Sequence, residues 1–440
     1  MLFDSPPKNW QVSTLGEICQ EGGGDIQTGP FGSQLHASDY VISGIPSIMP
    51  ANIKEGRVSE EGIARITEAD AKRLSKYLTK AGDIVYSRRG DVERCALIRK
   101  REEGWLCGTG CLRVRTGSGV VNPDFCSHFL SHPETKEWIS RHAVGATMPN
   151  LNTQILSALP VLLPSFQEQK AIAHILGTLD DKIELNRKTN ETLEAMAKAL
   201  FKSWFVDFDP VRAKAEGRPT GLPAEISDLF PDSFEDSELG EIPRGWKVGC
   251  LSDCCEITMG QSPPGDTYND EGDGLPFYQG KTDFGFRFPG RRIYCSSHTR
   301  QASIGATLIS VRAPVGSANI AREVCSIGRG IAALKSRQSA DSFIYYLIGT
   351  LQGVFESYNS EGTVFGAING KDLASIQVVA PSTEAVAAFN SQCLPMDESI
   401  QSNTLETEHL TTIRDTLLPK LISGEIRTPD AEKMLEEVGV

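Results

Sequence analysis

The stretch Gln167–Trp204, QEQKAIAHILGTLDDKIELNRKTNETLEAMAKALFKSW, decides the architecture of this 440-residue chain. Its apolar residues recur at alternating spacings of four and three, the period of a helix that lies along a partner helix. The same pattern returns 217 positions later, in the stretch 384–421. The matched positions are Ile172, Leu176, Leu179, Ile183, Asn186, Asn190, Leu193, Ala197, Leu200 and Trp204, and then Phe389, Cys393, Met396, Ile400, Asn403, Thr407, Leu410, Arg414, Leu417 and Leu421. The sequence therefore predicts two long helices with one shared seam pattern.

These two helices are expected to pack on each other as an antiparallel pair. An isolated helix with so narrow an apolar stripe is not stable in water. In an antiparallel pair, the central Asn186 and Asn403 are expected to meet and hydrogen-bond, which fixes the register at some cost in stability. Two alternatives remain: helices that only join ordinary domains, and helices that form a dimer through separate seams. The pattern shared by both stretches favours the intramolecular pair.

Segments outside the helices also repeat. Trp10 and Leu15 recur as Trp246 and Leu251. Further matches join Gly82–Arg88 to Gly305–Arg312, and Gly145–Ser165 to Gly362–Ser382. Each copy consists of short β-rich segments and turns, followed by a helix predicted at 123–141 in the first copy and 339–357 in the second. The fold class is therefore α/β (α+β), with a pseudo-twofold internal repeat.

The net charge of −13 is unevenly distributed along the chain. Segments 207–241 and 384–440 each carry a balance of −7. Residues 1–150 hold eighteen acids and eighteen bases, and residues 243–340 hold twelve bases against eight acids. The acidity therefore lies outside the globular copies, and it does not exclude DNA binding. Segment 207–241, rich in proline and acidic residues, is predicted to be a loose, solvated linker.

The composition is that of a folded, soluble protein, with 40% hydrophobic and 23% charged residues. No apolar run approaches the ~20 residues that a membrane span needs. The first ten residues contain no apolar stretch, so no signal peptide is expected. Eleven cysteines in 440 residues are too dilute for a disulfide scaffold, which favours reduced thiols in the cytoplasm.

Five motifs give the chain its resemblance to a known family. They are Leu163–Leu176 (LPSFQEQKAIAHIL), Leu179–Asn186 (LDDKIELN), Ala199–Pro210 (ALFKSWFVDFDP), Ser237–Trp246 (SELGEIPRGW) and Leu418–Ile426 (LPKLISGEI). In these motifs the chain resembles the specificity subunit of type I restriction-modification systems. The resemblance covers nearly the whole chain; it is highly specific in the helical regions and weak inside the two globular copies.

The resemblance implies two tandem, mixed β-rich target recognition domains, separated by a pair of long antiparallel coiled-coil helices. On this basis six segments are expected along the chain. They are recognition domain 1 (1–165), the central spacer helix (166–206), the acidic linker (207–241), recognition domain 2 (242–382), the C-terminal spacer helix (383–424) and a C-terminal tail (425–440).

The implied function is to read a bipartite site in double-stranded DNA without catalysis by this chain. The subunit would dock two adenine methylation subunits and two restriction or motor subunits, with no membrane contact. The chain itself would bind no cofactor, because S-adenosylmethionine, ATP and Mg²⁺ are expected on the partner subunits. One alternative is a self-sufficient Mg²⁺-dependent restriction endonuclease, and another is a coiled-coil scaffold with no role on DNA.

The endonuclease alternative depends on Asp124, Glu134 and Lys136, whose spacing is that of a loose metal-dependent nuclease motif. Such carboxylates normally stand on neighbouring strands, whereas Asn122-Pro-Asp predicts the start of a helix. A zinc site formed by Cys107, Cys111, Cys126 and His128 would have a non-standard spacing, so buried free thiols are favoured and no metal site is predicted.

The residues suited to reading bases lie in the loops of the globular copies. Arginine pairs with guanine in the major groove, and asparagine or glutamine pairs with adenine. Lys281, with Arg287, Arg291 and Arg292, is also suited to phosphate contacts, which position a protein without specifying sequence. The DNA-binding candidates are Gln27, Ser33, Gln34, Arg88, Arg89, Asn150 and Asn152 in the first copy, and Gln261, Tyr268, Gln279, Lys281, Arg312 and Arg329 in the second.

Overall fold

The computed structural model describes residue 7 and residues 9–145, 147–312, 314–360 and 366–437. These residues form two compact units. Unit 1 consists of Met1–Asn186 and Leu405–Val440, and unit 2 consists of Arg187–Thr404. No helix in the described part of the chain is long and apolar enough to cross a membrane.

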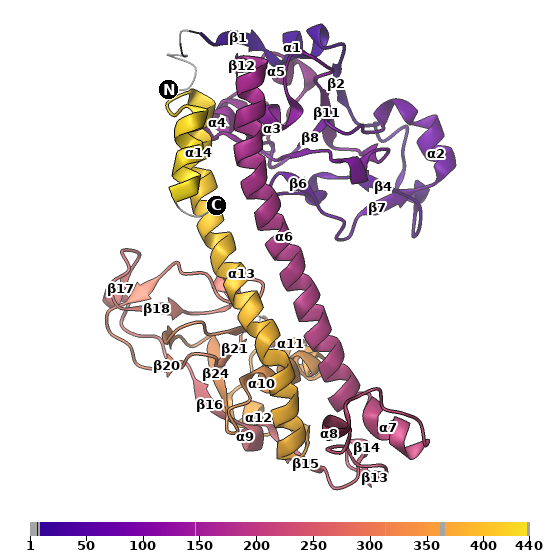
Figure 1. Cartoon of the computed structure of the whole chain (residues 1–440), viewed down its shortest axis with the longest axis vertical. Coiled ribbons are helices and arrows are strands. Elements are labelled where there is room, and N and C mark those ends of the chain that lie inside the picture. Colours follow the sequence, from indigo (N-terminus) through magenta and orange to yellow (C-terminus); the bar gives the residue numbers. More distant parts are fainter. Residues whose placement is uncertain (1–6, 8, 146, 313, 361–365, 438–440) are drawn as a thin grey trace. The chain divides into compact units, whose positions relative to one another are not determined.

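Two long helices run through both units, and each contributes about one half of its length to unit 1 and the other half to unit 2 (Figure 1). Helix α6 (Phe166–Phe205) has 40 residues and α13 (Thr383–Ser423) has 41, so each is about 60 Å long at ~1.5 Å per residue. None of the twenty predicted seam positions is exposed. The predicted helices and their shared seam are therefore confirmed.

Within each unit the two helix halves pack antiparallel. In unit 1, the aliphatic seam residues of α6 and α13 belong to one buried cluster. In unit 2, the halves meet through aromatic rings, with 5.4 Å between the ring centroids of Phe201 and Phe389. Each unit therefore buries the helix stripe that would be unstable in an isolated helix.

The described residues of the globular part of unit 1 form two four-stranded sheets and two strand pairs. The strand orders are β2-β11-β8-β9 and β10-β4-β7-β3, and the pairs are β1-β12 and β5-β6. The strands are β1 (Gln11–Thr14), β2 (Asp25–Thr28), β3 (Tyr40–Val41), β4 (Ile45–Ile48), β5 (Ile53–Lys54), β6 (Arg57–Val58), β7 (Ala64–Ile66), β8 (Ile84–Ser87), β9 (Cys95–Leu97), β10 (Leu106–Cys107), β11 (Cys111–Arg115) and β12 (Pro160–Leu163).

In its described residues unit 2 repeats most of this topology, but its second sheet has one additional strand, and its second strand pair lies in 234–243, at the entry to the second copy. Its sheets have the orders β16-β24-β21-β22 and β17-β19-β18-β23-β20, and its pairs are β15-β25 and β13-β14. The strands are β13 (Phe234–Ser237), β14 (Gly240–Pro243), β15 (Lys247–Cys250), β16 (Cys255–Met259), β17 (Tyr268–Asn269), β18 (Leu275–Tyr278), β19 (Tyr294–Cys295), β20 (Gln301–Ala302), β21 (Thr307–Ser310), β22 (Ala318–Ile320), β23 (Cys325–Ile327), β24 (Ile331–Ser336) and β25 (Gln377–Ala380).

The strand registers show that the two copies are equivalent. Gln11 faces Leu163 in the antiparallel pair β1-β12, and the matching residues Lys247 and Ala380 face each other in β15-β25. Each unit also contains one parallel pair, β4 with β10 in unit 1 and β18 with β23 in unit 2. The predicted internal repeat is confirmed at the level of strand pairing.

The remaining helices are shorter. The helices predicted near 123–141 and 339–357 are each present as two consecutive helices, α3 with α4 and α10 with α11. The shorter helices are α1 (Leu15–Glu21), α2 (Glu68–Arg73), α3 (Pro123–Ser131), α4 (Pro133–His142), α5 (Thr153–Ser157), α7 (Asp209–Ala215), α8 (Ala224–Ser227), α9 (Leu251–Cys254), α10 (Asp341–Thr350), α11 (Gln352–Ser360), α12 (Gly370–Ala374) and α14 (Thr428–Glu437).

The segment 207–241 is not the loose linker that the sequence predicts. It contains α7, α8 and β13 with the start of β14. Phe208, Val211 and Phe230 are at most 8% exposed and belong to the core of unit 2. Burial of these side chains favours an ordered segment, and each contributes about 1.5–3 kcal/mol by removing apolar surface from water.

The described part of the predicted C-terminal tail is mostly helical. Helix α14 occupies much of it, and its Ala431 is fully buried in the core of unit 1. Leu435 packs against the same core, one turn later on the same helix face. The acidic composition of this segment therefore describes the outer face of a packed helix.

Candidate nucleic-acid interface

Three loops of unit 1 converge at the end of strand β8. The N–H of Arg88, the first residue after β8, donates to the carbonyl of Gly110 at 2.8 Å. Arg89 forms a β-bridge with Asn150, and the N–H of Leu151 donates to the carbonyl of Arg88 at 2.9 Å. Arg88 also lies against Phe31, 5.7 Å from the ring centroid. Three predicted residues, Arg88, Arg89 and Asn150, are therefore brought together.

Two buried side-chain atoms of this loop cluster lack partners within the described part of unit 1. The buried Nε of Arg88 and the buried Oδ1 of Asn150 have no hydrogen-bond partner there. Arg89 is exposed. The buried Nε and Oδ1 are closed to an external ligand, so the groups suited to a base edge are the terminal Nη groups of Arg88 and the side chain of Arg89.

Two other predicted residues of unit 1 have structural roles. The side-chain oxygen of Gln34 accepts the hydroxyl of Tyr77 at 2.8 Å, and Asn152 caps α5 by accepting the N–H of Ile155 at 2.8 Å. Asn369, the equivalent of Asn152 in the second copy, caps α12 in the same way. Ser33 is exposed, and the half-buried Gln27 lies in the middle of β2, so both remain predictions.

Unit 2 forms an equivalent cluster around the turn between β23 and β24. Arg329 and Gly330 lie in this turn; the N–H of Arg329 donates to Ser262 Oγ at 3.4 Å, and that of Gly330 donates to the carbonyl of Gln279 at 3.1 Å. The N–H of Val311 donates to the carbonyl of Gly330 at 2.9 Å, and Arg312 directly follows Val311. The predicted residues Gln261, Gln279, Arg312 and Arg329 are therefore neighbours, and all four are exposed.

Arg89 and Arg312 occupy the same position in the two copies. Each lies two residues after the end of its strand, β8 or β21. Arg89 bridges to Asn150, and Arg312 bridges to Ala367, which is 217 residues after Asn150. The structure thus presents one matched exposed arginine in each copy.

The other basic and aromatic candidates of unit 2 differ in whether their side chains are free to contact DNA. Lys281 is exposed, whereas the hydroxyl of Tyr268 donates to the carbonyl of Pro263 at 3.0 Å. Arg291 and Arg292 form surface ion pairs with acidic side chains, at 2.6 and 2.8 Å. Arg287, suggested as a phosphate contact, is only 1% exposed, so that suggestion is wrong.

Arg287 instead forms a buried ionic cluster with both long helices of unit 2. Its guanidinium donates to Glu194 of α6, to Asp397 of α13 and, at 2.8 Å, to the hydroxyl of Tyr346. Burial would lower the pKa of Arg287, but the charges of Asp397 and Glu194 raise it, so the arginine stays charged. No local sequence signal marks this cluster, because Arg287 lies in a polar loop among other arginines.

The predicted hydrogen bond between Asn186 and Asn403 is replaced by two others. Asn186 donates to Glu406 at 2.8 Å within unit 1, and Asn403 donates to Asn190 at 2.9 Å within unit 2. Asn190 in turn donates to Thr404 at 3.3 Å. The antiparallel register therefore places each asparagine about one turn away from the expected pairing.

The residues of the endonuclease alternative lie in a helical region. Asp124 is in the first turn of α3 and Glu134 in the first turn of α4. Asp124 pairs with Arg99, at 3.6 Å. These carboxylates therefore do not stand on neighbouring strands, as the nuclease chemistry needs.

The cysteines considered for zinc are buried in separate hydrophobic clusters. Cys107 and Cys111 belong to one cluster of unit 1, and Cys126 belongs to another. Burial raises the pKa of the Cys107 thiol to about 12, so it stays protonated. In the described residues, no three His, Cys, Asp or Glu side chains are grouped so as to hold a metal ion.

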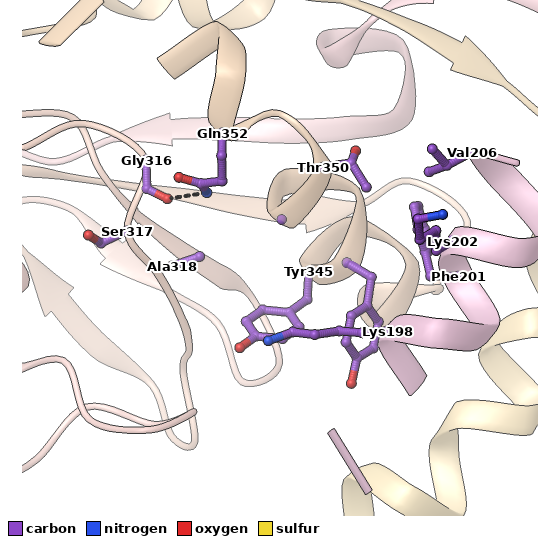
Figure 2. A pocket seen from close by; sticks show the side chains of 12 residues that line it. Lys198, Phe201, Lys202, Val206, Gly316, Ser317, Ala318, Tyr345, Thr350 and Gln352 are labelled. Atoms are coloured by element: carbon purple, nitrogen blue, oxygen red, sulfur yellow. Dashed lines mark hydrogen bonds between the residues drawn. The ribbon is translucent and has the colours of Figure 1, made fainter. Parts of the chain in front are cut away.

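A cavity of about 580 Å³ in unit 2 lies between α6, α10 and the loop that precedes β22. Figure 2 shows that loop bound to α11, where the Gln352 amide donates to the carbonyl of Gly316 at 2.9 Å. The two lysines of the cavity, Lys198 and Lys202, are paired with acidic side chains. Because its positive charge is compensated, this cavity is a poor site for a DNA phosphate.

Comparison with known proteins shows the family. The profile described as "Type I restriction modification DNA specificity domain" matches twice, at residues 7–195 and 243–392. The chain is 30% identical to a Methanocaldococcus jannaschii protein provisionally named the MjaX type I restriction enzyme specificity subunit, over 96% of this chain and 94% of that protein. It is 28% identical to the HindI specificity subunit of Haemophilus influenzae, over 81% of this chain and 89% of that protein.

A solved structure shares the fold. It is the type I restriction-modification S subunit of M. genitalium, with 17% identity, a TM-score of 0.62, and coverage of 96% of this chain and 97% of that chain. The family assignment contradicts the self-sufficient endonuclease, because its members are DNA-recognition subunits without catalysis of their own. Two matched domains, two specificity-subunit relatives and the duplicated fold establish that the chain belongs to the family of type I restriction-modification DNA specificity subunits.

Proposed function

We propose that each globular copy reads one half of a bipartite site in double-stranded DNA. The first copy would do so through the loops around Arg88, Arg89 and Asn150, and the second through the loops around Arg312 and Arg329. The observation that carries the proposal is the matched pair Arg89 and Arg312, exposed in equivalent loop clusters. Duplicated loops on rigid sheets are a common arrangement for paired binding sites.

The proposed partners are two adenine methylation subunits and two restriction or motor subunits, assembled in the cytoplasm. S-adenosylmethionine, ATP and Mg²⁺ would be bound by those partners, and this chain would supply DNA recognition. Supporting this division, the polar clusters of the two units are rich in hydrogen-bonding groups for base edges. The long helices α6 and α13 are proposed to set the gap between the half-sites.

A domain exchange tests the proposal. Residues 1–165 are replaced by the matching segment of a relative, and methylated adenines are mapped genome-wide with and without the chain. We expect one half-site to change and the other to stay the same. Adding seven residues to each long helix is the matched control, which should lengthen the gap and alter neither half-site. Methylation without any sequence preference would instead support the scaffold alternative.

A further inference from the structure

We infer that unit 1 reads a guanine through Arg88, an inference that rests on the proposed DNA-reading function. Arg88 directly follows β8, a strand whose residues are all buried. Its backbone is held on both sides, by the carbonyl of Gly110 at 2.8 Å and by the N–H of Leu151 at 2.9 Å. The core of unit 1 therefore fixes the point from which this side chain leaves the backbone.

The guanidinium of Arg88 is held against an aromatic ring at the surface. Its central carbon lies 5.7 Å from the ring centroid of Phe31, and Phe31 is 53% exposed. Gln34 braces the loop, because its side-chain oxygen accepts the N–H of Phe31 at 3.2 Å and the hydroxyl of Tyr77 at 2.8 Å. An arginine that packs on a ring is pre-organised, so it loses less freedom when its planar edge binds a ligand.

Arg88 differs from Arg113 and Arg115 of the nearby strand β11 in having no charge partner among the described residues. Arg113 and Arg115 of β11 are bound to Asp25 and Asp83, at 2.5 Å and 2.6 Å. For Arg88, by contrast, the described residues provide no side-chain hydrogen-bond or ion-pair partner, and its Nε is buried without an acceptor. The terminal Nη groups of Arg88 are therefore left for an incoming pair of acceptors, whereas the buried Nε is out of their reach.

Guanine is the base that offers such a pair. Its O6 and N7 lie side by side in the major groove and accept both donors of one guanidinium. Comparison of the two copies distinguishes Arg88 from Arg89. Arg89 has an arginine, Arg312, at the equivalent position of the second copy, whereas Arg88 has Val311, which is 1% exposed. A residue present in both copies suits a phosphate, which carries no sequence information, and a residue present in one copy suits a base.

The test uses the full chain assembled with its methylation subunits. The probes are duplexes with the mapped site, in which each guanine of the half-site read by unit 1 is replaced in turn by 7-deazaguanine, which lacks N7. We expect one of these replacements to weaken DNA binding by the wild-type complex about tenfold. The same replacement should weaken binding by the Arg88→Gln complex less than about twofold. Arg88→Lys, which keeps the charge but not the fork of donors, should behave like Arg88→Gln.

Arg89→Gln is the matched control. It should weaken binding to all duplexes by a similar factor, reduce the slope of log Kd against log salt by about one, and keep the 7-deazaguanine effect. The inference is overturned if the half-site of unit 1 contains no guanine, or if both Arg88 variants keep the full effect at every guanine. A wild-type complex without any preferred site would refute the proposed function itself, and this inference with it.

Discussion

One position of the long helices is an aspartate in both units, but this aspartate binds a different arginine in each unit. Asp180 of α6 and Asp397 of α13 are equivalent, 217 residues apart. In unit 2, Asp397 accepts Arg287, which comes from a loop of the globular part. In unit 1, Asp180 binds Arg414 of α13, with 2.9 Å between Oδ1 and Nη1. The acid is therefore present in both copies, but it binds the globular part in one and the opposite helix in the other.

The globular part of unit 1 binds helix α6 through an arginine that is more exposed than Arg287. Arg57 donates to the carbonyl of Asp180 at 3.1 Å and to the carboxylate of Asp181 at 3.2 Å. The side chain of Arg57 is 26% exposed, whereas that of Arg287 is 1% exposed. Buried ion pairs contribute little net stability, but they penalise any other geometry. We therefore expect the second copy to be held on its helices more strictly than the first.

The largest effect is expected for Arg287→Ala. This change leaves Glu194 and Asp397 buried without their main partner, so the free energy of unfolding of unit 2 should fall by about 3–5 kcal/mol. Urea unfolding measures the loss, and hydrogen exchange should locate it in unit 2. Arg291→Ala is the control, since its pair with Glu323 is at the surface and should contribute less than about 1 kcal/mol. Equal losses in the two variants would contradict the role of burial.

A smaller effect is expected for Arg414→Ala in unit 1. The side chains of Arg414 and Asp180 are 25% and 23% exposed, and Arg414 also pairs with Asp415, at 2.8 Å. Water can reach the remaining carboxylate, so the loss should be about 1–2 kcal/mol. A double-mutant cycle with Asp180→Asn isolates the pair, and additive losses would show that the two side chains are not coupled.

The smallest effect is a pH dependence of the stability of unit 1. His128 and Tyr346 are each the sixth residue of their helix, α3 or α10. Burial lowers the pKa of His128, although Asp180 acts in the opposite direction. The unfolded chain therefore binds the proton more tightly, and this contribution to stability is full above about pH 6.5 and falls as the pH drops through the lower folded pKa.

Unfolding measured at pH 7.5 and pH 5.5 checks this dependence. We expect a loss in unit 1 smaller than that of Arg414→Ala, and a flatter pH profile in His128→Asn. In this variant the free energy of unfolding should still depend on pH to some extent, because burial also lowers the pKa of His132. Burial raises the pKa of Tyr346, so that side chain stays uncharged over this range and gives unit 2 no matching change. A variant with an unaltered profile would show that His128 is not the group responsible.

The seam and the repeat could be predicted because both depend on local periodicity. Positions such as Leu176 and Leu417 are apolar at a fixed spacing, and a helix buries such a stripe whatever its partner. The loop clusters around Arg88 and Arg312 could be predicted only in part. Arg88 and Arg89 could be chosen by residue type, but the capping role of Asn152 depends on where α5 begins.

The buried cluster could not be predicted, because its burial depends on contacts between distant parts of the chain. Arg287 lies 93 residues from Glu194 and 110 from Asp397, and nothing local marks it as internal. The ordered segment 207–241 left a clearer signal. Its aromatic residues Phe208 and Phe230 were outweighed by the prolines and acidic residues around them, although a solvated linker rarely contains such side chains.

The packing of Phe208, Val211 and Phe230 into the core of unit 2 has a practical consequence for chimeras. An exchange of the second recognition domain that begins at residue 242 would fit a foreign core against the resident aromatic side chains. The side chains of Phe208, Val211 and Phe230 would then have to pack against a core from a different protein. A graft that carries residues 207–382 keeps these three side chains together with the core into which they pack.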